Sequence, residues 1–236
     1  ARQMETHRWL KTHQVAIAAQ LQGCDSFTDL ARGFFAAVAP ILGVAHGVFY
    51  IYDEENHELR LLHGYALRER KQIHPTLRLG EGLVGQCAME RQPILLTQPP
   101  PDYVRIGSSL GEAVPAVLAL YPVLRNERLL AVVELAACRP IVDREQDLLD
   151  EVLPTLATNL EILERRSRTA RLLERSQEQA TELERQQSAL RATEAWYRVI
   201  IESAPDGILV LEGQGQVSLA NSRAEAMFGA GQAGLE

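Results

Sequence analysis

The feature that most constrains this chain is residues 155–204, a stretch of 50 residues that contains neither glycine nor proline. Glycine and proline disfavour a helix most strongly, so their absence over this length favours one long helix. The residues before the stretch read as a mixed unit of helices and strands, and those from Trp196 onward read as the opening of a second unit. Two units joined by one helix are suited to passing a conformational state along that helix. The sequence therefore indicates part of a signalling protein and not a free-standing enzyme.

Length, charge and hydropathy narrow the class of protein. The 236 residues have room for one domain of about 150 residues, a long helix and part of a second domain. The formal net charge of −7 argues against a nucleic-acid partner, which usually requires a basic surface. The longest apolar run, residues 113–124, is broken by Pro115 and Pro122 and is shorter than the about 20 residues that span a bilayer. We therefore expect a cytoplasmic location, in a soluble parent or on the cytoplasmic side of a membrane-anchored one.

The three cysteines, Cys24, Cys87 and Cys138, lie far apart in the sequence. They form no Cys-x-x-Cys pair and no cysteine–histidine spacing typical of zinc ligands. Neither a disulfide framework nor a structural metal site is expected, and a reducing compartment fits this composition. We expect the three cysteines to act as small apolar side chains.

Apolar and turn-forming residues alternate in a pattern that predicts an α+β fold before residue 165. Apolar residues at helical spacing predict helices, short apolar runs predict strands, and glycine, proline and acidic turns separate them. The expected helices cover 4–21 and 27–39, with a short helix ending near 91 and an exit helix capped by Asp143 and Gln146. The expected strands are 48–52, 59–65, 93–97, 116–124 and 129–136, with a loop at 98–111. These elements make one mostly antiparallel sheet with helices packed on it.

Three segments in this region resemble the GAF sensory domain, and the resemblance extends over about residues 25–165. The segments are Leu79-Gly-Glu-Gly-Leu-Val-Gly85, Arg91-Gln-Pro-Ile-Leu95, and Tyr121-Pro-Val-Leu124 together with Leu130-Ala-Val-Val-Glu-Leu135. In GAF folds a short helix and the following crossover loop enclose a ligand pocket, which maps here to 82–91 and 98–113. The resemblance implies that a small-molecule pocket would be lined by Tyr50, Tyr52, Cys87, Tyr103, Arg105, Ser108, Ser109 and Tyr121.

The identity of a ligand or cofactor is not readable from the sequence. The signature of GAF domains that bind cyclic nucleotides is absent, and no cysteine has the adjacent histidine of bilin-attachment sites. No histidine stands out as a haem ligand; His57 lies in a His-Glu-Leu-Arg run that resembles a kinase phosphoacceptor motif but enters a predicted strand. A domain with an empty pocket that acts as a dimerising relay is an alternative.

The exit helix carries two leucine stripes at heptad spacing. The first stripe is Leu149, Leu153, Leu156, Leu160 and Leu163, and the second is Leu173, Ser176, Ala180, Leu183, Gln187 and Leu190. Heptad stripes favour a two-stranded coiled coil, so we expect a parallel homodimer along residues 148–197. The two stripes are offset by one residue, which predicts a local distortion and a coil with two competing phases.

From Trp196 onward the chain resembles the start of a PAS domain. The run Ile200-Ile-Glu-Ser-Ala-Pro-Asp-Gly-Ile-Leu-Val-Leu211 matches its entry helix and first strand, and Asn221 matches the segment that follows. We also expect Ser222 and Glu225 to form a capping box there. The resulting division is an N-terminal helix, a GAF-like domain, an exit helix with coiled coil, and an incomplete PAS domain, at 1–24, 25–147, 148–196 and 197–236.

The order GAF, coiled coil, PAS favours the sensory and relay region of a sensor histidine kinase in a two-component system. A region of this kind has no catalytic residues of its own. The input region of a diguanylate cyclase or phosphodiesterase is the alternative within the same class. A different class is represented by free methionine sulfoxide reductases, which resemble GAF domains and use cysteines near the pocket; here Cys87 is the matching candidate.

Overall fold

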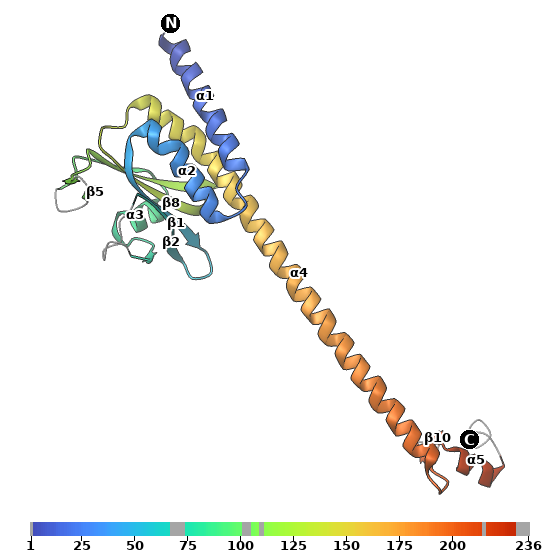
Figure 1. Ribbon diagram of the computed structural model, residues 1–236. Helices are drawn as coiled ribbons and strands as arrows, with labels where there is room; N and C mark the ends of the chain where they lie inside the picture. Colours follow the sequence, from blue (N-terminus) through green and yellow to red (C-terminus); the bar gives the residue numbers. More distant parts are fainter. Residues whose placement is uncertain (1, 67–73, 101–104, 109–110, 214–215, 230–236) are drawn as a thin grey trace. The chain divides into compact units, whose positions relative to one another are not determined.

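The structure is a computed structural model that describes the chain except residues 1, 67–73, 101–104, 109–110, 214–215 and 230–236 (Figure 1). The side chains of residues 2, 3 and 108 also lie outside the description. The chain divides into two compact units, residues 1–168 and residues 169–236. The helix α4 (Asp143–Ser203) contributes to both units.

The first unit is built on a six-stranded sheet with the strand order β3-β2-β1-β8-β7-β4. Every neighbouring pair of strands in it is antiparallel, which confirms the predicted fold class. Its strands are β1 (Val44–Asp53), β2 (Glu58–Tyr65), β3 (Thr76–Arg78), β4 (Ile94–Thr97), β7 (Val117–Arg125) and β8 (Arg128–Ala137). A separate hairpin, β5 (Ile106–Ser108) with β6 (Gly111–Ala113), occupies part of the segment expected to be a loop.

Two hairpin turns fix the register of the central strands. Between β7 and β8, Asn126 and Glu127 have positive φ angles of 46° and 64°, as a two-residue turn between twisted strands requires. Between β1 and β2, the Asp53 carboxylate accepts hydrogen bonds from the backbone N–H groups of Glu55 and Asn56, at 3.1 and 3.2 Å. Both turns lie between strands that the sequence predicts, 48–52 with 59–65 and 116–124 with 129–136.

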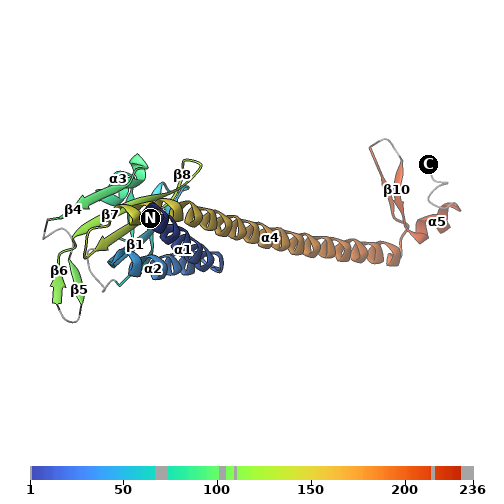
Figure 2. The ribbon, with the colours of Figure 1, turned by 90° about the horizontal axis from the view of Figure 1, so that it is seen from above.

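One face of the sheet is covered by α1 (Arg2–Gln22), α2 (Phe27–Leu42) and the first half of α4 (Figures 1 and 2). The centre of this core is an aromatic group in which Phe34, Phe35 and Phe49 meet edge to face, with ring centroids 5.6 to 6.5 Å apart. A side chain at Gly47 would place its Cβ 2.3 Å from the Phe35 ring, so α2 reaches the sheet only because this residue is glycine. We call this layer the helix face.

The opposite face carries α3 (Gly82–Glu90). A Cβ at Gly85 would lie 2.3 Å from the Arg78 carbonyl oxygen, so the start of α3 can meet the end of β3 only with glycine at this position. Gly80 and Gly82 adopt positive φ angles of 82° and 63°. The glycine-rich run therefore serves chain geometry.

The first leucine stripe of α4 packs inside the chain and does not face a second copy. Its five leucines belong to the core of the helix face and are at most 9% exposed: Leu149, Leu153, Leu156, Leu160 and Leu163. Contacts within one chain thus occupy the five leucines that were expected to form the first part of the dimer seam. A stripe at heptad spacing suits any apolar surface alongside a helix, and here that surface is the chain's own sheet.

The start of α4 is capped one residue earlier than the sequence predicts. The Glu145 carboxylate, and not the Asp143 and Gln146 pair, accepts the backbone N–H of Val142 at 3.1 Å. Arg139 donates two bonds to the same carboxylate, each 2.8 Å long, and a third, 2.7 Å long, to the Ile41 carbonyl. Burial opposes ionisation of Glu145, but these hydrogen bonds outweigh it and lower its pKa. This pairing fastens α4 to the end of α2.

The second unit contains the end of α4, β9 (Leu209–Leu211), β10 (Val217–Ala220) and α5 (Ser222–Phe228). Asn221 is fully buried there and is the N-cap of α5. Its amide donates to the carbonyls of Ile201 and Asp206, at 2.9 and 3.0 Å. Its side-chain oxygen accepts from the backbone of Ile208 and Ala224, at 2.8 and 2.9 Å.

Asn221 takes the capping role that the sequence analysis assigned to Ser222. The Ser222 hydroxyl instead donates to the Glu202 carboxylate at 2.6 Å. Together these bonds tie the end of α4 to α5 and to the start of β9. The conformation of α4 at its C-terminal end is thereby held by backbone contacts of the second unit.

Replacing a leucine by alanine should destabilise the protein strongly in the first half of α4 and only slightly beyond residue 168. Leu156→Ala removes a fully buried side chain and should lower the free energy of unfolding by about 2–5 kcal/mol. The control, Leu172→Ala, removes a side chain that is 59% exposed and should change it by less than about 0.5 kcal/mol. Urea denaturation followed by circular dichroism measures both values, and equal losses would contradict the assigned packing.

Candidate functional site

The face of the sheet that carries α3 is the candidate ligand site. We call it the α3 face and define it by its buried apolar cluster, which comprises Val48, Tyr50, Leu59, Leu77, Val84, Cys87, Ala88, Ile106, Leu118, Leu120, Leu129, Val132 and Ala136. These residues come from the central strands, from α3 and from the β5 hairpin. The cluster is separate from the core of the helix face, so the sheet is apolar on both sides.

Glu134 lies in the middle of this apolar face. On β8, Val133 and Leu135 belong to the helix face, whereas Val132 and Ala136 belong to the α3 face. Side chains alternate along a strand, so Glu134 points to the α3 face. Its cross-strand partners, Val48 on β1 and Leu120 on β7, belong to the same cluster. A carboxylate thus occupies the centre of an otherwise apolar row.

Burial raises the pKa of Glu134 from 4.5 to about 7, because its apolar surroundings disfavour the charged form. Within the described part of the chain, its carboxylate has no hydrogen bond or ion pair. The residue is partly exposed, and no fully buried side-chain oxygen among the described residues lacks a partner. The carboxylate therefore retains access to solvent.

Tyr50 is a polar group on the same face whose pKa responds to the charge of Glu134. Burial, and secondly the Glu134 charge, raise the pKa of Tyr50 to about 12. The Tyr50 hydroxyl donates a long hydrogen bond, 3.5 Å, to the His74 carbonyl. Glu134 and Tyr50 thus place a carboxylate acceptor and a hydroxyl with one long hydrogen bond on the same apolar face.

Three of the residues expected to line a pocket lie together on the α3 face: Tyr50, Tyr52 and Cys87. The Tyr52 hydroxyl is bonded to His57 Nδ1 at 3.1 Å, so this histidine is held at the hairpin turn. Arg105 is exposed and forms an ion pair of 3.6 Å with Glu112. Tyr103 and Ser109 lie outside the described residues, as does the side chain of Ser108, whose backbone is in β5.

Tyr121 is not with the other expected pocket residues. It belongs to the core of the helix face, and burial, with a smaller contribution from Asp150 on α4, raises its pKa to about 12. Its neighbour Leu120 faces α3 instead. An error of one residue in the assumed alternation of β7 moves a side chain to the opposite face, which explains the misplacement.

Cys87 lacks the properties of a reactive thiol. It is fully buried, and its Sγ donates to the Gln92 carbonyl at 3.3 Å. Burial, with a smaller contribution from Glu90, raises its pKa to about 12, so the thiolate needed for nucleophilic or redox chemistry does not form near neutral pH. Its role on the α3 face is packing.

Sequence reasoning missed Glu134, although a signal was present. It is the one charged residue in residues 129–137, an apolar run that becomes an interior strand. A charge in a strand that is buried on both faces is uncommon, because ionised groups are costly to bury. That placement could have singled out Glu134 once β8 was assigned to the sheet interior.

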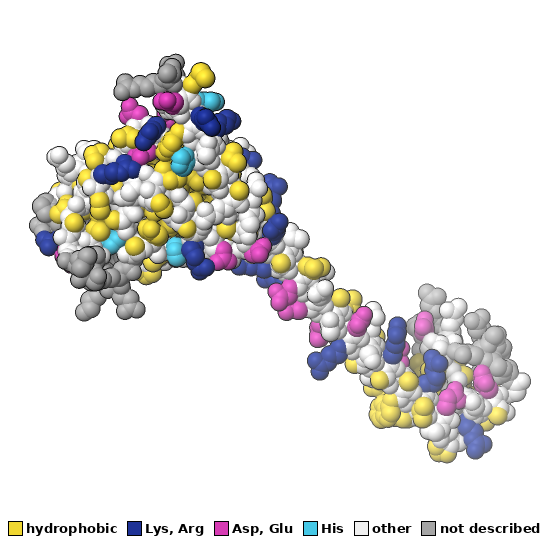
Figure 3. Space-filling model, turned by 45° about the horizontal axis from the view of Figure 1, so that its top comes forward, with side chains coloured by type: hydrophobic (Ala, Val, Ile, Leu, Met, Phe, Trp, Pro, Cys, Tyr) yellow, Lys and Arg dark blue, Asp and Glu magenta, His cyan; other side chains and the backbone are white. Residues whose placement is uncertain are grey.

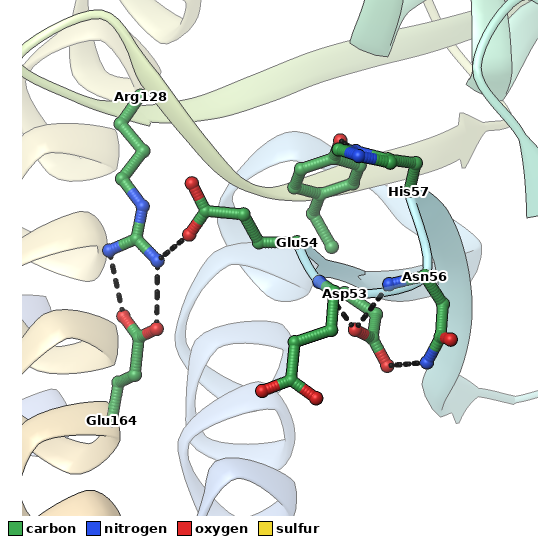
Figure 4. A network of polar contacts seen from close by, with 8 residues as sticks. Asp53, Glu54, Asn56, His57, Arg128 and Glu164 are labelled. Atoms are coloured by element: carbon green, nitrogen blue, oxygen red, sulfur yellow. Dashed lines mark hydrogen bonds and ion pairs between the residues drawn. The ribbon is translucent and has the colours of Figure 1, made fainter.

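A second cluster joins the hairpin turns to α4 at the point where α4 leaves the sheet (Figure 4). The Arg128 guanidinium donates two hydrogen bonds to Glu164, 3.0 and 2.8 Å long, and one to Glu54, 2.6 Å long. Arg125, at the other end of the β7–β8 turn, donates to Glu161 at 3.2 Å. We call these five residues the exit clamp. It lies next to Leu163, the last buried residue of the first leucine stripe.

No group of three or more histidine, cysteine and acidic residues in the described ranges is placed to hold a metal ion. Among the helices that the structure describes, none combines the length and apolarity needed to cross a membrane.

The raised pKa of Glu134 predicts a pH dependence of stability. The folded state binds a proton more tightly than the unfolded state, whose carboxyl keeps a pKa near 4.5. The stabilisation is therefore complete below the unfolded pKa and is lost as the pH rises through about 7. Glu134→Gln should remove this loss, so the stability of the variant relative to wild type should rise over that window.

Urea unfolding across this pH range measures the effect, with Glu127→Gln, at an exposed turn position, as the control. Parallel pH profiles of wild type and Glu134→Gln would contradict the assigned environment of the carboxyl group.

Residues 24–161 match the sequence profile of the GAF domain family, and residues 195–236 match that of a PAS domain. Among curated proteins, no sequence match was found.

Solved structures share the fold of the first unit at low sequence identity. The GAF domain of the Acinetobacter phosphoenolpyruvate-protein phosphotransferase is 18% identical, with a TM-score of 0.54 over 65% of this chain and 93% of that chain. The corresponding domain from Coxiella burnetii is 18% identical, with a TM-score of 0.55 over 68% and 96%. The free methionine-R-sulfoxide reductase of Neisseria meningitidis, solved with its substrate, is 15% identical, with a TM-score of 0.53 over 67% and 91%.

Proposed function

Because this chain belongs to the GAF domain family and continues into a PAS-type segment, we propose that it is the sensory and relay region of a sensor histidine kinase. In this proposal the α3 face senses a small molecule, and α4 carries the resulting change to the PAS segment. The chain itself contributes no catalytic step, and the parent acts in the cytoplasm. The paired sensory domains support a signalling input region, and the kinase output is the part that we infer.

The observation that carries the proposal is the double role of β8. Glu134 faces the ligand side, whereas Val133 and Leu135, its neighbours in sequence, pack in the core that contains α4. A rigid strand cannot shift one set of side chains without the other, and packed interiors transmit small displacements. Binding on the α3 face therefore acts on α4 through the thickness of a single sheet.

The exit clamp provides a second connection between the sheet and α4. Arg128 holds the β1–β2 turn, through Glu54, and α4, through Glu164, at the same guanidinium. β1 also carries Tyr50 and Tyr52 of the α3 face. The Arg128 pairs are half-exposed and the bond to Glu164 is bidentate, so this guanidinium links the β1–β2 turn directly to α4. These are properties of a junction that responds to movement of the hairpin.

The second leucine stripe supports a parallel homodimer. Leu173, Leu183 and Leu190 are 57–60% exposed, and charged residues flank them along α4 (Figure 3). A long helix with an unpaired apolar stripe is unstable in water, and a second copy can bury the stripe at heptad spacing. We place the dimer contact after residue 168, beyond the leucines that pack on the sheet.

Placing the dimer contact after residue 168 also explains the one-residue offset between the two leucine stripes. One residue corresponds to about 100° of rotation about a helix, so the two stripes face different directions. The first faces the sheet of its own chain, and the second is available to a partner. The offset then lets one helix present apolar residues to two different surfaces. Two competing coiled-coil phases are not needed to explain it.

Two alternatives differ in how they fit these contacts. An input region for a diguanylate cyclase or phosphodiesterase would use the same relay and differ only in the output. A free methionine sulfoxide reductase would need a reactive cysteine, and the burial and raised pKa of Cys87 disfavour it. The kinase proposal therefore takes precedence over the reductase.

The dimer proposal predicts a change of mass when the second stripe is charged. Leu183→Glu together with Leu190→Glu should convert a dimer into a monomer at tens of micromolar in sedimentation equilibrium, because like charges would meet in the seam. Thr181→Glu together with Ser188→Glu adds the same charges outside the stripe and should leave the dimer intact. A monomeric wild type would refute the dimer.

The relay proposal predicts a phase effect on output in the parent protein. Inserting one residue after Ala170 turns the following helix by about 100° and should lock autophosphorylation on or off. Inserting seven residues restores the heptad phase and should preserve regulation. Equal regulation in both variants would reduce α4 to a tether.

A further inference from the structure

We propose that the α3 face binds a small organic cation, an amine or amidine on an apolar body, with the Glu134 carboxylate as its anchor. This inference deepens the proposed function, because it names the ligand class of the sensory face. It rests on the position of Glu134, on the character of its neighbours and on the polar groups that share the face.

The position of Glu134 favours a ligand that brings its own hydrogen-bond donor. Val48 and Leu120 flank the carboxylate across the sheet, and neither offers a polar side chain. Among the described residues none donates to it, although it lies on an interior strand. An apolar ligand would cover the carboxylate without compensating it, and an anion would be repelled. An ammonium or amidinium group satisfies it.

The other polar groups on or beside the face are already engaged or too weak to replace the ligand. Cys87 donates to Gln92, and Tyr52 is bonded to His57. His46 is buried, lies across from Ala136 and has interactions of its own. Glu90, beside Cys87, adds negative and not positive charge.

Tyr50 is the exception, because the only bond of its hydroxyl to a described residue is the long one to His74. Since that hydroxyl can accept as well as donate, a cation between Tyr50 and Glu134 would find two oxygen acceptors. The side chains around them are apolar, so we expect the body of such a ligand to be an aryl or alkyl group.

Binding of a cation at this site should also release the proton of the Glu134 carboxyl group. A cation pairs with the ionised carboxylate, so Glu134 must lose its proton when the cation binds. The titratable groups on or beside this face are His46, Tyr50, Tyr52, Cys87 and Glu90, and none places a lasting positive charge at Glu134. Affinity for a cation should therefore rise between about pH 6 and about pH 8, where carboxyl groups raised in this way ionise.

Isothermal titration calorimetry of this chain with three probes of matched shape tests the proposal. The probes are 2-phenylethylamine, a cation; 2-phenylethanol, which is neutral; and 3-phenylpropionate, an anion. We expect saturable binding of the amine alone at millimolar concentration, stronger at about pH 8 than at about pH 6. Glu134→Gln should weaken it about tenfold or more, as the loss of a charge-assisted bond does, and Glu127→Gln should leave it unchanged.

Equal binding of all three probes, no binding of the amine, or amine binding unaffected by Glu134→Gln would each overturn the inference. The comparison of probes on the wild-type chain holds even if the variant does not fold. The experiment measures binding to this chain, whereas the insertion experiment measures output of the parent, so failure of the ligand class and failure of the relay are distinguishable.

Discussion

The alternation of side chains along β8 is the constraint on which the rest of the structure depends. This interior strand is buried on both faces, and its odd-numbered residues from 131 to 137 join the core beneath α2 and α4. Val132 and Ala136 join the α3 face, with Glu134 between them. A shift of one residue would place Glu134 in the helix core and expose the aliphatic residues to the ligand side. The two tight hairpin turns prevent such a shift by fixing the pairing of β8 with β7 and of β1 with β2.

Communication across the sheet follows from this arrangement and needs no separate pathway. α4 is held at its start by Arg139 and Glu145, along its first half by leucines, and at the sheet exit by Arg128. The buried leucine contacts and the bidentate pair of Arg128 with Glu164 both join α4 to the sheet, so a displacement of the sheet reaches α4 along its first half and at the exit. Beyond it, the same helix reaches the residues that Asn221 ties to the second unit.

Several parts of this structure were predictable from local sequence. The glycine and proline pattern located the long helix, the apolar runs at 116–124 and 129–136 located the β7–β8 hairpin, and the resemblance to GAF domains located α3. The pocket residues were predicted only in part. Tyr50, Tyr52 and Cys87 share the α3 face, whereas Tyr121 lies on the opposite face. A strand buried on both sides has no polar face to reveal its orientation, so sequence alone could not settle which residues pointed where.

The sequence by itself determined the elements, their order and the GAF and PAS character of the chain, because turns, caps and apolar periodicity are local properties. Only the tertiary structure decided which surface each apolar stripe meets. Leucines at heptad spacing read the same whether they face a second helix or a sheet, and Leu156 meets the sheet whereas Leu183 remains exposed. It also decided that Glu134 lies on an apolar face where none of the described residues donates a hydrogen bond to it. Its neighbours there, Val48 and Leu120, come from strands far away in sequence, and no local pattern records such contacts.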